Sequence, residues 1–317
     1  MIVTSGLEVA AATASTGSPA FRYEVDPNAY TYKNIPGTEI TFGSAAGESS
    51  YLRSTGIVAS SVDTLESGDN IGNTFAIICQ YSDGTALPGS VEAGAYWATN
   101  IVPPSEVSIT PAIRWVFTAP TTATYTCRLS VTSYSTIIRN GRTVTMQVAA
   151  GAQLNRSQYA GSAGWTLSEG QGTIIQRGSD TSVMSFTYEP RGSGRTTIVQ
   201  DAALSTCKPL SSICDGGTSA YTGTKAETWI EAQPLTAGGE PCGPLIKSAP
   251  NTWSISTAKH HQTAMNSLYI DHAQIVECEK IVITMRIRNV DGNPLYVHAG
   301  WAINNMAATH GFALTAY

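Results

Sequence analysis

The chain has 317 residues, only 13% of them charged, and a formal net charge of -5. It contains no block of Lys or Arg, which argues against nucleic acid and anionic membrane surfaces as partners, because both require a concentrated basic patch. No apolar run reaches the ~18 residues of a transmembrane helix, and the runs of strong helix formers expected of a helical enzyme are nearly absent.

The N-terminal segment from Met1 to Pro19 is polar and rich in small residues. It lacks the basic region and the apolar core of a signal peptide. If the protein is secreted, we therefore expect its signal peptide to have been removed from this sequence.

Apolar and polar residues alternate in several segments along the chain, which is typical of strands with one buried face. The alternation predicts strands over 75–81, 125–131, 142–148, 184–188, 268–278 and 281–288. Turn sequences separate these segments. Asn140-Gly141 lies between two β-rich runs and suits a type I′ hairpin.

A short segment of the N-terminal half adds to this pattern. Trp115–Pro120 is followed by Tyr125–Val131, and the pair resembles a sequence found in jelly-roll and immunoglobulin-like sandwiches. The resemblance covers about 17 residues and implies a fold class alone. We predict an all-β, antiparallel β-sandwich protein of the jelly-roll or immunoglobulin-like type, stabilised by disulfides.

The domain organisation is indicated by a change in composition. Residues 149–164 are rich in Ala, Gly and Ser and lack a strand pattern. We expect an N-terminal sandwich over 1–150 and a C-terminal sandwich over 151–317. The alternative is one large β-domain, because a long loop has a similar composition.

The chain has six cysteines, which could form three disulfides. Cys79 and Cys127 both point to the apolar side of their predicted strands, so we expect them to pair. We also expect pairing of Cys207 with Cys214, which flank a short loop, and of Cys242 with Cys278. The sequence contains no C-x-x-C pair, the close spacing that is typical of zinc sites. The expected disulfides indicate an oxidising compartment.

Two groups of side chains could bind metal ions. All five histidines lie near the C-terminus, and His260, His261, His272 and Asp271 could supply imidazole and carboxylate ligands. The acidic loop of Asp63, Glu66 and Asp69 offers oxygen ligands for calcium. Hydrogen-bonded core histidines and a solvated acidic turn are the structural alternatives, and we expect no other cofactor.

Aromatic side chains could form a carbohydrate platform, because sugars stack their apolar faces on exposed rings. The candidates lie in or between polar segments; the alternative for each is a place in the core. They are Tyr30, Tyr32, Tyr96, Trp97 and Trp253.

The sequence contains no G-x-S-x-G elbow, H-E-x-x-H motif, P-loop or Rossmann fingerprint. We therefore favour a secreted or cell-surface binding protein for a glycan or protein ligand, and lean against an enzyme. A self-associating structural subunit of an extracellular fibre, coat or envelope layer is one alternative. A hydrolase or metal-dependent enzyme that uses the C-terminal histidines is the other.

Overall fold

The computed structural model describes residues 13–25, 31–89, 91–104, 106–159, 161–167, 172–190, 194–208, 221–300 and 306–315. Strands dominate these segments, and their helical elements are two short 3-10 helices, η1 (Arg139–Gly141) and η2 (His272–Gln274). Within the described segments, no helix is long and apolar enough to span a membrane. The predicted all-β, disulfide-stabilised sandwich fold is confirmed.

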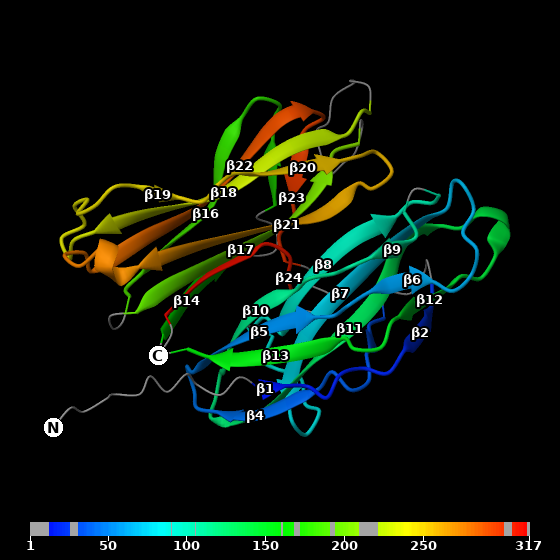
Figure 1. Ribbon diagram of the computed structural model, residues 1–317, viewed down its shortest axis with the longest axis horizontal. Helices are drawn as coiled ribbons and strands as arrows, with labels where there is room; N and C mark the ends of the chain where they lie inside the picture. Colours follow the sequence, from blue (N-terminus) through cyan, green and yellow to red (C-terminus); the bar gives the residue numbers. More distant parts are fainter. Residues whose placement is uncertain are drawn as a thin grey trace.

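The first sandwich consists of three sheets around one apolar core (Figure 1). Sheet A has the order β1-β13-β5-β10, sheet B the order β2-β12-β6-β9, and sheet C the order β24-β8-β7-β11-β3, with β4 also paired to β11. The strands are β1 (Thr13–Ala14), β2 (Phe21–Glu24), β3 (Lys33–Asn34), β4 (Ile40–Ser44), β5 (Ser49–Thr55), β6 (Ala59–Ser61), β7 (Asn70–Tyr81), β8 (Gly94–Ile101), β9 (Ser108–Ile109), β10 (Arg114–Thr118), β11 (Ala123–Ile137), β12 (Thr145–Val148), β13 (Gln153–Gln158) and β24 (Met306–Ala307).

The second sandwich packs two sheets face to face, with apolar clusters drawn from both. Sheet D has the order β14-β25-β17-β23-β15, with β21 on the other side of β17, and sheet E the order β16-β22-β18-β19, with β20 also paired to β18. Its strands are β14 (Gly161–Thr166), β15 (Thr173–Ile175), β16 (Asp180–Tyr188), β17 (Arg195–Thr206), β18 (Thr224–Leu235), β19 (Ile246–Lys247), β20 (Asn251–Ile255), β21 (His261–Asp271), β22 (Lys280–Gly292), β23 (Leu295–Val297) and β25 (His310–Thr315).

The two sandwiches are joined by strands that cross between them. The last strands of the chain, red in Figure 1, return to the junction, where β24 pairs in parallel with β8 of the first sandwich. Val199, Phe312 and Leu314 of sheet D are part of the first sandwich's core. β13, which lies beyond residue 150, pairs with β5 in sheet A; the division at residue 150 and the alternative of one large β-domain stay predictions.

A buried ion pair also connects the two sandwiches. The guanidinium of Arg114 on β10 bonds both carboxylate oxygens of Asp201 on β17. It also donates to the Ser267 hydroxyl at 2.7 Å and to the Asn266 carbonyl at 3.0 Å. Burial alone would raise the pKa of Asp201, but the adjacent Arg114, together with His310, holds that pKa below its ordinary value. The carboxylate is therefore charged and fully compensated in the folded protein.

The predicted disulfides Cys79–Cys127 and Cys242–Cys278 are both present. Cys79 and Cys127 are direct partners on the neighbouring strands β7 and β11, and their Cα atoms are 4.1 Å apart. Cys207 is also disulfide-bonded, whereas Cys214, its predicted partner, lies outside the described residues.

Two local predictions differ from the structure. Asn140 and Gly141 have positive φ values of 62° and 63°, as a type I′ turn requires, but β11 and β12 do not pair and enter sheets C and B. The strand predicted over 268–278 ends at Asp271, whose side chain accepts a bond from the Ala273 amide and begins η2. This local cap offers the backbone an alternative to the strand ladder.

Candidate ligand-binding groove between the two sandwiches

A cavity of about 290 Å³ opens where the two sandwiches meet, between β10 of sheet A and β14 of sheet D. Both strands stand at the end of their sheet order. We call this cavity the β10–β14 groove. Its lining residues are Gly47, Ser49, Val91, Glu92, Trp115, Val116, Thr118, Ser162, Ala163, Gly164, Trp165, Thr166 and Phe312.

Trp115 forms a rigid part of the groove wall. It is almost fully buried, and its ring meets Phe312 of β25 edge to face, with centroids 5.2 Å apart. A second edge-to-face contact joins Trp115 to His310 at 5.4 Å. Its indole Nε1 is buried without a hydrogen-bond partner. Aromatic contacts of this geometry hold the ring in one orientation.

Trp165 also lines the groove. Unlike the buried Trp115, it leaves 46% of its surface exposed. It lies on β14, whose neighbouring residues are small. A Cβ atom on Gly164 would lie 2.1 Å from the Phe312 ring, so only glycine allows β14 to pass this closely over β25.

Polar side chains bridge the groove near both ends of β14. Ser162 donates to the Ser49 hydroxyl at 2.6 Å, and the Thr166 hydroxyl donates to the Glu92 carboxylate. Ser162 and Thr166 are four residues apart, which is about 13 Å along a strand. Among the described residues that line the groove, Glu92 is the one ionisable side chain.

Of the five aromatic residues predicted for ligand binding, the four that the structure describes do not line this groove. Tyr30 lies outside the described residues, while Tyr96 and Trp97 pack in or against apolar clusters. Trp253 packs against the second sandwich's core and donates its indole N–H to Thr228 at 2.9 Å. The Tyr32 hydroxyl is buried without a partner, and burial raises the pKa of Tyr32.

Sequence reasoning missed both groove tryptophans as ligand-binding residues. Trp115 entered only as part of a fold signature, and Trp165 follows the small-residue segment that was interpreted as a domain boundary. The usable signal was this juxtaposition: a tryptophan beside Gly and Ala has few local side chains to cover its ring.

Three of the five histidines come together beside β17. The rings of His260 and His261 are 4.2 Å apart, and those of His261 and His298 are 5.3 Å apart. The Ser205 hydroxyl lies 2.8 Å from His298 Nε2, and Tyr296 packs edge to face on His298. The cause is sheet topology, because β21 and β23 both pair with β17 at Ser205.

His272 and Asp271 lie at the opposite end of β21 from this cluster. His272 Nε2 is 2.8 Å from the Thr196 hydroxyl, and Asp271 caps η2. The structure thus separates the four side chains of the predicted metal site into two locations. Within the described residues, no group of three or more His, Cys, Asp or Glu has the arrangement of a metal site.

The histidine cluster should make the protein less stable in acid. Burial, and then the neighbouring His260, lowers the pKa of His298 to about 4, and burial, followed by the neighbouring groups His298, His260 and Lys208, lowers the pKa of His261 well below its ordinary value. The exposed Lys208 is one of those groups. Because the unfolded state binds these protons first, stability is lost as the pH falls from about 6.5 towards 4.

We expect His298 alone to contribute about 2 kcal/mol of this loss, somewhat less than its pKa shift implies, because the side chain is only partly buried. Urea unfolding of the wild type and of His298→Gln at pH 7.5 and pH 4.5 measures it. The variant should lose less stability between the two pH values than the wild type. An equal loss in both proteins would contradict the assignment.

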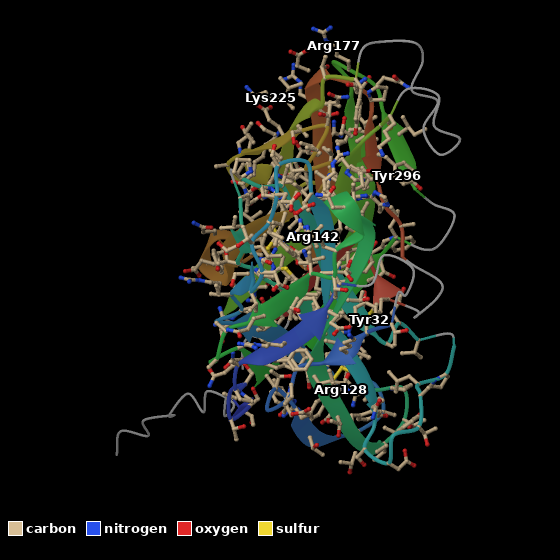
Figure 2. All side chains as sticks on the ribbon, turned by 90° about the vertical axis from the view of Figure 1, so that its right-hand side faces the viewer. Tyr32, Arg128, Arg142, Arg177, Lys225 and Tyr296 are labelled. Atoms are coloured by element: carbon tan, nitrogen blue, oxygen red, sulfur yellow. A yellow bond between two sulfur atoms is a disulfide. The ribbon has the colours of Figure 1, made fainter. Side chains whose placement is uncertain are left out.

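The predicted calcium loop has its carboxylates in hydrogen bonds within the chain. Asp69 is fully buried, accepts from the amides of Glu66 and Arg139, and pairs with Arg142 at 2.6 Å; Figure 2 labels Arg142. Asp63 accepts from the Thr145 amide at 2.7 Å. The loop therefore ties β7, η1 and β12 together.

No protein family model and no curated protein matches the chain. Solved structures that match include that of infectious bursal disease virus Gx strain, at 11% identity over 99% of this chain and 77% of that chain, with a TM-score of 0.27. PNGase F, a glycosylasparaginase from Flavobacterium meningosepticum, matches at 8% identity over 94% and 96%, with a TM-score of 0.34. The CBM22 tandem domain of Paenibacillus barcinonensis Xyn10C matches at 10% identity over 98% and 95%, with a TM-score of 0.24. Similarities this distant do not identify the function of the chain.

Proposed function

We propose that this chain is an extracellular binding protein that holds a glycan in the β10–β14 groove. The observation that carries the proposal is Trp165, an aromatic residue that lines the groove and leaves 46% of its surface exposed, while other lining residues carry hydroxyl groups. A sugar ring has an apolar C–H face that stacks on an indole and a rim of hydroxyls that need hydrogen bonds. A concave site with an aromatic platform and a few polar groups meets both requirements.

The polar lining suits sugar hydroxyls. Ser49, Thr118 and Ser162 each carry a hydroxyl that both donates and accepts, and Glu92 supplies a carboxylate acceptor. The existing bridges Ser162–Ser49 and Thr166–Glu92 pre-position these groups. A ligand therefore meets side chains that are already ordered, which lowers the entropic cost of binding.

The disulfides support the extracellular location. Two bridges, Cys79–Cys127 and Cys242–Cys278, lie within the described residues, where no cysteine is free. Disulfides persist in oxidising compartments and are rare in the cytosol. Such a location is also where glycan ligands are displayed.

We expect Trp165→Ala to weaken glycan binding at least about tenfold, a loss of about 1.4 kcal/mol. A glycan array identifies the ligand, and isothermal titration calorimetry then compares the proteins. Tyr269→Ala is the matched control, because Tyr269 on β21 is also an exposed aromatic, at 59%, and does not line the groove. Equal losses in the two variants would contradict the assignment of the groove.

The same samples test the alternative function. If no glycan binds and light scattering at high protein concentration shows assembly, a structural subunit of a coat, fibre or envelope layer becomes the better proposal. A protein that binds a glycan and stays monomeric would contradict this alternative, in which the weakly charged composition serves self-assembly.

A further inference from the structure

The charge of the β10–β14 groove narrows the ligands it can accept. Among its described lining residues Glu92 alone is ionisable, and no Lys or Arg side chain lines it. The nearby Arg114 is directed to Asp201 and to acceptors on β17 and β21. An anionic sugar in the groove would therefore face a carboxylate without a compensating cation, and like charges repel most strongly where water is partly excluded.

Glu92 is held in the groove by a bond to a neighbouring strand. The Thr166 hydroxyl on β14 donates to one of its carboxylate oxygens, and the side chain is only partly exposed. Swinging Glu92 away from an acidic ligand would break this bond. A fixed carboxylate rejects an anion more effectively than a free side chain on the surface, which can turn into solvent.

The two polar bridges set the length of the groove. Ser162–Ser49 joins β14 to β5, and Thr166–Glu92 joins β14 to the segment before β8, at positions about 13 Å apart along β14. A long polymer running between the bridges would have to break them. The end of a glycan chain can enter without doing so.

We infer that the β10–β14 groove recognises the uncharged terminal sugars of a glycan and that Glu92 excludes acidic ones. This inference rests on the proposed function and adds the ligand class and the residue that selects it. The recognised chemistry is a neutral pyranose end with free hydroxyls. A terminal uronate is rejected because its carboxylate meets Glu92.

The test uses matched trisaccharides that differ only in the terminal sugar: glucose and glucuronate, galactose and galacturonate, and mannose and mannuronate, each attached to the surface through its reducing end. We expect the wild type to bind at least one neutral trisaccharide and to bind its uronate partner at least tenfold more weakly. In Glu92→Gln this ratio should fall at least threefold, because the amide keeps an acceptor for Thr166 and removes the charge. The ratio remains informative even if the variant binds both members less tightly.

Glu240→Gln is the matched control, since it removes the same charge from an exposed residue outside the groove. Its ratio should equal that of the wild type. Equal or stronger binding of the uronates by the wild type would overturn the inference while leaving glycan binding intact. An unchanged ratio in Glu92→Gln, or the same fall in Glu240→Gln, would overturn the role of Glu92. Binding of none of the six, combined with an empty glycan array, would instead overturn the proposed function.

Discussion

Asp201→Asn should lower the free energy of unfolding by about 3–5 kcal/mol, the range typical of a buried ion pair that loses one partner. The substitution keeps the shape of the side chain and removes its charge. Arg114 would then remain charged and buried, with only neutral acceptors such as the Asn266 carbonyl and the Ser267 hydroxyl. Urea unfolding at pH 7 measures the loss.

The control for this prediction is an exposed ion pair. Arg177 lies at the outer end of the second sandwich (Figure 2) and contacts Asp291 at 2.7 Å, with both side chains more than 60% exposed. Arg177→Gln should change the unfolding free energy by less than about 1 kcal/mol. If Asp201→Asn cost no more than this control, Arg114 would not need Asp201 for compensation.

A third variant tests the geometry of the pair. Arg114 bonds acceptors on Asp201, Ser267 and Asn266 at the same time, which requires the planar fork of a guanidinium. Arg114→Lys keeps the charge but presents a single ammonium group. We expect it to be destabilising as well, which would show that the junction depends on the arrangement of donors in addition to their charge.

The strands were predictable from sequence wherever one face is buried and the other meets solvent. The alternation of Met184, Phe186 and Tyr188 corresponds to three buried positions on β16. β17 is different, because it is buried on both faces over most of its length. Its polar residues Gln200 and Asp201 are buried at the junction between the sandwiches. Because both faces of β17 are buried, apolar and polar residues do not alternate along it, and the sequence pattern does not predict this strand.

The groove could not be predicted because its walls come from distant parts of the chain. Trp115 and Trp165 are on strands of different sheets, and only the docking of the two sandwiches brings them to one cavity. The histidine cluster has the same origin: His261 and His298 meet because both flanking strands pair with β17 at Ser205. Strand order is a long-range property, whereas alternation reports only which face of a strand is buried.

The cysteine pairing was predictable for a different reason. A disulfide needs two Cys whose Cα atoms lie within about 7 Å and whose Cβ atoms point towards each other, and the alternation around Cys79 and Cys127 indicated the face of each strand on which the Cys lies. The structure places them directly opposite each other on β7 and β11. The direction of the two Cys side chains was enough to predict this pair, because the strand beside β7 is β11, on which Cys127 also points to the apolar face.

Removing this bridge should have the second large effect on stability. We expect Cys79→Ala/Cys127→Ala to lose about 4 kcal/mol of unfolding free energy, because the bridge closes a loop with a sequence separation of 48 residues and so restricts the unfolded chain. Guanidinium unfolding of the oxidised protein and the double variant measures the difference. A thiol titration of the denatured wild type without reductant should find no free cysteine at these positions.

Cys242→Ala/Cys278→Ala separates the entropic contribution from the packing contribution. Its sequence separation of 36 gives nearly the same entropic loss, but Cys242 and Cys278 are only partly buried, whereas Cys79 and Cys127 lie in the core of the first sandwich. If loop closure alone determines the cost, the two double variants should lose similar amounts. A larger loss for Cys79→Ala/Cys127→Ala would measure the cavity left in the core, and a smaller one would contradict the argument that this bridge stabilises the sandwich.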